Sequence, residues 1–157
     1  MQQATVDQLK IEWILMADSA EVLGGKLYML GGGWDRMPAS ASKDSKDSRV
    51  FALAFSILVP WHQANEKHTM KIEIIDEDGK RTIFKVEGEF EVGRPAGAVR
   101  GQLLRVPIAV KYMGTIEQPG TYAVIGSLDG EESCRTQFHV QLPPGTHAGP
   151  SATPPAN

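Results

Sequence analysis

The sequence contains few of the residues on which covalent or metal-based chemistry depends. Cys134 is the only cysteine, so no disulfide can form within the chain, and we expect its thiol to pack as a small apolar group. His62 and His68 are six residues apart, which is not a metal-ligand spacing on any regular element, and the other two histidines lie far along the chain. We therefore predict no metal, no cofactor and no catalytic residue.

Excess charge and long apolar runs are also missing. The formal net charge is −3, which gives no general attraction to phosphate backbones, so we predict no nucleic-acid partner. No apolar run approaches the roughly 20 residues of a membrane span, and residues 1–10 lack the basic start and apolar core of a secretion signal. These absences predict a cytoplasmic protein without a membrane partner.

Alternation of apolar and polar residues is the feature that the sequence does have. In residues 49–59 every second residue is large and apolar while the residues between are small, which predicts a central strand. Residues 9–16 have apolar side chains on both faces, so we expect a strand that is covered on both sides. Pro107 interrupts another alternating segment, 104–112, and predicts that this strand lies at a sheet edge.

The clearest local pattern is a β-hairpin over residues 70–92, with one apolar and one charged face and an acidic turn at 76–79. Two registers keep the faces apart. We prefer the one in which Ile74 faces Thr82, because it places Gly79 in the left-handed position of a three-residue loop. The alternative pairs Glu73 with Lys85 and Lys71 with Glu87, but places Lys80 in the left-handed position.

Together these segments predict an all-β protein of about eight strands without a convincing helix. The expected fold is an antiparallel β-sandwich with an Ig-like or jelly-roll-like topology. We expect a single domain over residues 1–142. Residues 143–157 contain five of the ten prolines and little to bury, so we predict a disordered tail.

Several segments resemble a family of uncharacterised bacterial proteins, a domain-of-unknown-function group. The resemblance rests on GGGWDR at 31–36, VPWHQAN at 59–65 and DEDG at 76–79, with VPIAV at 106–110 and PGTYAV at 119–124 in the expected places. It covers residues 9–142. Such a resemblance implies a fold but no activity, substrate or cofactor.

The candidate binding residues follow two strand-ending signals. Trp34, Asp35 and Arg36 come after three glycines, and Trp61 and His62 come after Pro60. We expect both tryptophans at one end of the sandwich, where Asp35 and His62 would approach each other and raise the pKa of the histidine. The competing interpretation is that the two indole rings only close the core.

Two further motifs have structural interpretations that we favour. The glycines at 31–33 are followed by neither a Lys-Ser/Thr pair nor a helix, so a bend or bulge is preferred to a phosphate loop. Glu87, Glu89 and Glu91 form an acidic stripe, which is typical of a protected sheet edge.

The functional prediction is a non-enzymatic β-sandwich module for binding or assembly. We expect a protein partner or self-association, because no catalytic signature is present. The alternative is a small-molecule-binding enzyme, a hydrolase, with its site near Trp34, Asp35, Trp61 and His62.

Overall fold

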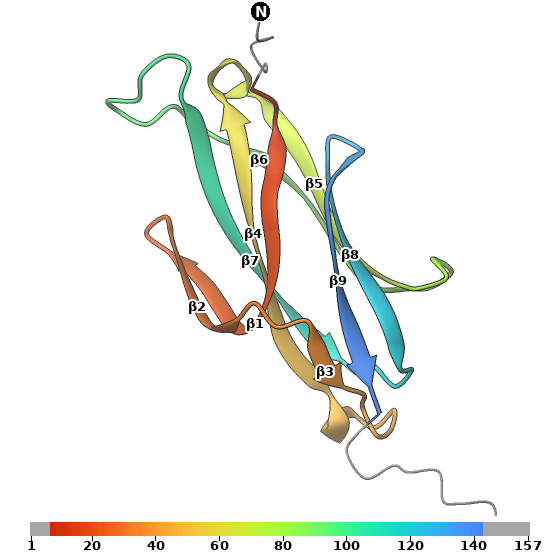
Figure 1. Ribbon diagram of the computed structural model, residues 1–157. Coiled ribbons are helices and arrows are strands. Elements are labelled where there is room, and N and C mark those ends of the chain that lie inside the picture. Colours follow the sequence, from red (N-terminus) through yellow and green to blue (C-terminus); the bar gives the residue numbers. More distant parts are fainter. Residues whose placement is uncertain (1–6, 143–157) are drawn as a thin grey trace, which may run out of the picture.

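The structure is a computed structural model, and it describes residues 7–142. These residues form nine strands that lie in two facing layers (Figure 1). The strands are β1 (Lys10–Leu23), β2 (Lys26–Gly32), β3 (Arg36–Pro38), β4 (Arg49–Pro60), β5 (Lys67–Asp76), β6 (Thr82–Glu91), β7 (Leu103–Gly114), β8 (Gly120–Leu128) and β9 (Glu131–Gln141). The helical elements within this part of the chain are two 3₁₀ turns, η1 (Ser45–Asp47) and η2 (Trp61–Gln63).

The first sheet has the strand order β2-β1-β4-β7, and the second has the order β3-β9-β8-β5-β6. This arrangement confirms the predicted all-β fold with two sheets. The strand that sequence analysis missed is β3, whose three residues pair in parallel with β9 while the other pairings are antiparallel. Three residues are too few to show a period-two pattern, so β3 left no signal in the sequence.

β4 is the central strand of the first sheet, as predicted. Its large residues, Phe51 to Val59 in steps of two, face the second sheet and are almost completely buried. The small residues between them are buried as well, with Ala52, Ala54 and Ser56 at most 4% exposed. Because an outer sheet face is normally open to solvent, something must cover this side of β4.

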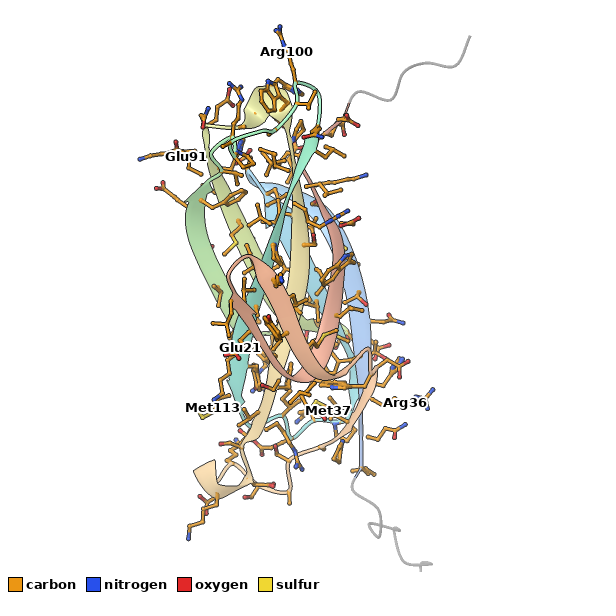
Figure 2. All side chains as sticks on the ribbon, turned by 90° about the vertical axis from the view of Figure 1, so that its left-hand side faces the viewer. Glu21, Arg36, Met37, Glu91, Arg100 and Met113 are labelled. Atoms are coloured by element: carbon orange, nitrogen blue, oxygen red, sulfur yellow. The ribbon has the colours of Figure 1, made fainter. Side chains whose placement is uncertain are left out.

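The cover comes from β1, which is one strand of 14 residues rather than the short strand predicted over 9–16. Its first half pairs with β4, and its second half forms a hairpin with β2. Both β1 and β2 contact β7, on the far side of β4 in the sheet order, so the hairpin curls across the outer face (Figure 2). The small side chains of β4 leave room for this crossing.

A β-bulge explains why the start of β1 is apolar on both faces. Ile11 pairs with Ile57 but Trp13 pairs with Ser56, so Glu12 is the additional residue on β1. In a regular strand Ile11 would point away from the face of residues 14 and 16. The bulge turns Ile11 toward the core, where all three residues are buried. Glu12 forms two hydrogen bonds of 3.0 Å with the guanidinium of Arg105 on the outer side.

The β5–β6 hairpin has the register that sequence analysis rejected. Glu73 pairs with Lys85 and Lys71 with Glu87, so the preferred pairing of Ile74 with Thr82 was wrong. In the sequence analysis this register placed Lys80, not Gly79, in the left-handed position of the turn. A register shift next to Ile74 removes this difficulty, because the pairing changes by one residue before the turn. The cross-strand charge pairs are kept, and Gly79 still takes the left-handed conformation, with φ of 67°.

The remaining strand prediction concerns a sheet edge. Pro107 lies in β7, which is an edge strand of the first sheet, as predicted. The glycine- and proline-containing link at 93–101 joins β6 in one sheet to β7 in the other. The predicted tail, residues 143–157, lies outside the described residues.

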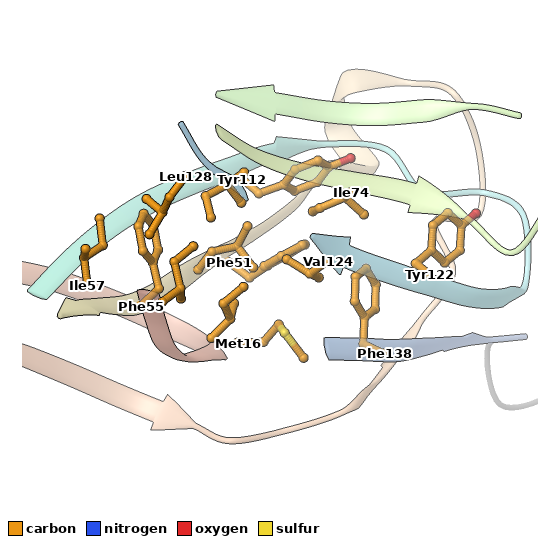
Figure 3. Close-up of a cluster of buried hydrophobic side chains, with 14 of the residues drawn as sticks. Met16, Phe51, Phe55, Ile57, Ile74, Tyr112, Tyr122, Val124, Leu128 and Phe138 are labelled. Carbon is orange, nitrogen blue, oxygen red and sulfur yellow. The ribbon is translucent and has the colours of Figure 1, made fainter. Parts of the chain in front are cut away.

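The core lies between the two sheets and is rich in aromatic rings (Figure 3). Phe51 stacks on Tyr112 with 4.7 Å between ring centroids and meets Phe138 edge-on at 5.9 Å. Toward the other end the core is tightly packed around Gly126. A Cβ there would overlap the Cδ1 of Ile11 and would lie 3.1 Å from that of Ile14. A side chain at this point of β8 would therefore have to displace the end of the Ile11 side chain.

We expect Gly126→Ala to lower the free energy of unfolding by about 1–3 kcal/mol, because the added methyl overpacks the core. Ile11→Val removes the Cδ1 that the methyl meets, so it should cost less in the Gly126→Ala chain than in the wild type, where the loss is about 0.5–1.5 kcal/mol. Urea denaturation of the four chains measures this coupling. Equal costs of Ile11→Val in both backgrounds would contradict the proposed contact.

Candidate functional site

Trp34 closes one end of the core. Its ring meets Phe51 edge-on at 5.4 Å and Phe138 at 6.3 Å. The neighbouring Gly33 has φ of 87° and donates its N–H to the carbonyl oxygen of Met16 at 2.8 Å, so the glycines bend the chain from β2 toward β3. Gly31 is also left-handed, and the Asp18 side chain occupies the place of its missing Cβ. This is the bend with a close approach that the sequence favoured over a phosphate loop.

A groove of about 360 Å³ lies beside Trp34, between the start of β4 and β3. Its lining residues are Asp18, Trp34, Arg36, Met37, Pro38, Arg49, Val50 and Phe51. The buried Nε1 of Trp34 and Nε of Arg49 have no hydrogen-bond acceptor among the described residues. Such donors can bind a carbonyl or carboxylate oxygen, but no serine, cysteine or histidine lines the groove to act as a nucleophile or base.

Asp35 and Arg36 lie at the rim with two-thirds of each side chain exposed, and their charged groups are 3.6 Å apart. An ion pair so open to solvent contributes little to stability. The backbone of Asp35 has the clearer role, since its carbonyl oxygen accepts the N–H of His139 at 2.7 Å and starts the β3–β9 pairing.

Trp61 and His62 lie at the opposite end of the sandwich. Trp34 packs against Phe51 at the start of β4, whereas Trp61 follows Pro60 at its end, and strand geometry separates these points by about 30 Å. The predicted approach of Asp35 to His62 is therefore wrong. The error concerns the path of the chain. The chain passes from β3 to the start of β4 at the same end of the sandwich, where Trp34 lies, and then follows β4 to Trp61 at the other end.

Arg94 holds Trp61 in place from the β6–β7 link. Its guanidinium lies 4.6 Å from the ring centroid, and its Nη2 donates a 3.0 Å hydrogen bond to the Trp61 carbonyl oxygen. Cation–π contact and hydrogen bond together fix η2 against the link. His62, beside it, is exposed. Whether any of the five candidate residues binds a ligand stays a prediction.

Sequence analysis missed the most strongly constrained polar group, His68, which is 4% exposed. Its Nδ1 lies 2.9 Å from Oδ2 of Asp129, and its Nε2 lies 2.9 Å from the carbonyl oxygen of Gln63. Both neighbours are acceptors, and a neutral imidazole has only one N–H, so the two hydrogen bonds require the protonated ring. Alternation does place His68 on the apolar face of β5, but nothing in the sequence identifies its partners.

Electrostatics at His68 agree with this geometry. Burial opposes the charged ring, but the hydrogen bonds to Gln63 and Asp129 outweigh burial and raise the pKa of His68 above its ordinary value. Burial likewise opposes ionisation of Asp129, yet the N–H of Thr69 and the His68 ring lower the pKa of that carboxyl. The pair therefore fastens η2 to the β8–β9 turn, and its occupied Nε2 is unsuited to act as a catalytic base.

Other chemistry-bearing groups give no site. Burial raises the pKa of the Cys134 thiol, so the thiol stays protonated at neutral pH. Within residues 7–142, no group of three or more His, Cys, Asp or Glu side chains is placed to hold a metal ion. In the acidic stripe, Glu87 pairs with Lys85 at 3.0 Å.

The largest concentration of exposed apolar side chains lies on the β1–β2 hairpin. Leu23, Tyr28 and Leu30 are 56%, 53% and 73% exposed. Ser19 pairs with Leu30 and Glu21 with Tyr28, so these apolar side chains share one face, while Val22 and Leu27 on the other face are half-buried toward the sheet. We call the face that carries Leu23, Tyr28 and Leu30 the hairpin face.

Comparison with known proteins identifies a family and includes a weak structural likeness. Residues 12–141 match the model of a family described as a family of unknown function (DUF6941). Among curated proteins, none matches the chain. Among solved structures, a Pseudomonas fluorescens alkylpurine DNA glycosylase, AlkC, bound to DNA with an abasic-site analog, is similar with 11% identity and a TM-score of 0.38. The match covers 82% of this chain and 30% of the glycosylase.

The glycosylase corrects one prediction. Nucleic acid was excluded as a partner on net charge, and that exclusion is contradicted by a neighbour whose structure contains DNA. The physical error is that net charge averages over the surface and does not describe any one face. A likeness this weak assigns no DNA binding to the chain. As for membranes, none of the helices in the described part is long and apolar enough to cross one.

The His68–Asp129 pair predicts a pH-dependent stability. Since the pKa of His68 is raised by folding, its contribution is fully present below about pH 6.5, the value of a free histidine, and is lost as the pH rises through the folded-state pKa. We expect Asp129→Asn to abolish most of this fall and to cost about 1–2 kcal/mol at pH 6, allowing for the half-exposed carboxylate. Urea denaturation between pH 5.5 and 9 measures both effects.

Glu132→Gln provides the matched control, since it removes an exposed carboxylate of the neighbouring strand, paired with Arg135 at 2.8 Å. Its pH profile should parallel the wild type. A wild-type slope that persists in Asp129→Asn would show that the His68–Asp129 pair is not its source.

Proposed function

Because the chain belongs to a family of unknown function, which offers no activity to transfer, we propose from its own surface that it is a non-enzymatic β-sandwich module for protein binding or assembly. The single observation that supports this most strongly is the hairpin face. Isolated exposed leucines are ordinary, but three large apolar side chains exposed on one face of a single hairpin are typical of an interaction site.

The positions of the polar groups favour binding over catalysis. The alternative hydrolase needs Trp34 and Asp35 beside Trp61 and His62, and these pairs lie at opposite ends of β4. The His68–Asp129 pair has the composition of a catalytic dyad, but a backbone carbonyl accepts from its second ring nitrogen. We therefore do not propose the hydrolase. The cytoplasmic location stays a prediction.

We further propose that the sandwich is Ig-like. In the Ig constant-type topology, the second and fifth strands pair in one sheet, and the third, sixth and seventh form the other. β4 and β7 would be the first pair, and β5, β8 and β9 the second set. β1 and β3 would then be a first strand divided between the two sheets, with the β1–β2 hairpin inserted at the division. This insertion is the part of the chain that carries the proposed contact surface.

The proposal predicts concentration-dependent self-association through the hairpin face. Burying a leucine side chain contributes about 1.5–3 kcal/mol, so replacing both Tyr28 and Leu30 by Asp should weaken association at least 100-fold. Sedimentation velocity at tens of micromolar should show an oligomer for the wild type and a monomer for this variant.

Val99→Asp is the matched control, because Val99 is 62% exposed in the β6–β7 link, away from the hairpin. It should associate like the wild type. A wild-type chain that stays monomeric would exclude assembly. Titration with a fluorescent DNA duplex tests the partner class that net charge had excluded, and binding lost in the Tyr28→Asp, Leu30→Asp chain would assign the hairpin face to DNA instead of protein.

A further inference from the structure

Four strand edges end the two sheets, and three of them are protected against pairing with another strand. β7 carries Pro107, which lacks an N–H, together with Arg105 and Lys111. β6 carries alternating charges from Lys85 to Glu91. β3 has only three residues and ends in a proline. Proline, charge and short length are the usual means by which proteins prevent edge-to-edge pairing.

β2 has none of these protections. Over its seven residues the only charge is Lys26 at its start, followed by Leu27, Tyr28, Met29 and Leu30 and then two glycines. Among residues 7–142 it pairs with β1 alone, so the N–H and C=O groups of its other edge have no strand partner. An exposed apolar edge of this length is a template for an added strand.

We propose that the occupant of this edge is β2 of a second copy, paired antiparallel about a two-fold axis at Met29. This inference rests on the proposed assembly function and names its partner and register. With Met29 at the axis, Tyr28 faces Leu30 of the second copy and Leu30 faces its Tyr28. The two-fold axis therefore repeats the same tyrosine–leucine contact on both sides, as a symmetric interface requires.

The charges of the strand fit the same register. Lys26 faces Gly32 of the second copy, so the two lysines lie at opposite ends of the paired strands, about 20 Å apart. The dimer therefore forms without bringing like charges of β2 together.

The pairing also extends the hairpin face. Two hairpins joined at β2 form a four-stranded ribbon, and side chains that share a face in one hairpin continue onto the same face of the next. The exposed Tyr28 and Leu30 of both copies then form one apolar strip, flanked by Leu23 of each. Tyr28 of each copy would then contact Leu30 of the other copy across the paired strands.

Cysteine cross-linking tests the register. In a Cys134→Ala background, which removes the only native thiol, Met29→Cys places two cysteines opposite each other at the axis. Directly opposed residues of antiparallel strands have Cα atoms about 4.5–5.5 Å apart, within the range of a disulfide. Mild oxidation should convert most of the Met29→Cys chain to a covalent dimer on non-reducing gels.

Lys26→Cys is the matched control on the same exposed strand. Its two cysteines would be about 20 Å apart, too far to link, so this chain should stay monomeric on the gel. A mixture of Tyr28→Cys and Leu30→Cys chains gives an independent check, and it should cross-link several-fold more than either chain alone.

The outcomes separate this inference from the proposed function. If sedimentation shows an oligomer but Met29→Cys does not cross-link, or Lys26→Cys cross-links equally well, the β2 pairing is wrong while assembly stands. If the wild type is a monomer at tens of micromolar, both fail. Cross-linking at Met29 with none at Lys26 establishes the two-fold pairing.

Discussion

The rest of the structure depends on the burial of β4 on both faces. Its large side chains meet the second sheet, and its small ones lie under the β1–β2 hairpin. Such a strand needs a neighbour on each edge and a cover on each side, and the chain supplies all four from β1, β7, the second sheet and the hairpin. β1 therefore has to be long, because one strand provides both an edge partner and part of the cover.

Sequence reasoning succeeded where a periodic pattern determines an environment. The large-small alternation of 49–59 identified a central strand, and Pro107 identified an edge, because each depends on the strand alone. It failed where one inserted residue changes the relation between strands. The bulge at Glu12 and the shift beside Ile74 alter facing and register without altering composition, and the rejected register of β5–β6 became possible only through that shift.

The candidate site was predictable only in its parts. The bend after Gly33 and the packing of Trp34 follow from local signals, but the separation of Trp34 from Trp61 depends on the direction of β4, which no local signal contains. The contacts of His68 were not predictable for the same reason. Its ring is held by Gln63 and by Asp129, which is 61 residues away, and a contact of that sequence separation has no counterpart in the spacing of residues.

The continuity of β1 has a mechanical consequence. A load applied to the hairpin along the axis of β1 would be shared by the whole row of β1–β4 hydrogen bonds from Lys10 to Ala17, since all of them would be sheared together. A load applied across that axis would open the same row one bond at a time. The molecule is therefore stiff to pulling in one direction and weak in the other, and the junction at Ala17 and Asp18 is the point where a transverse force would begin to peel the strand away.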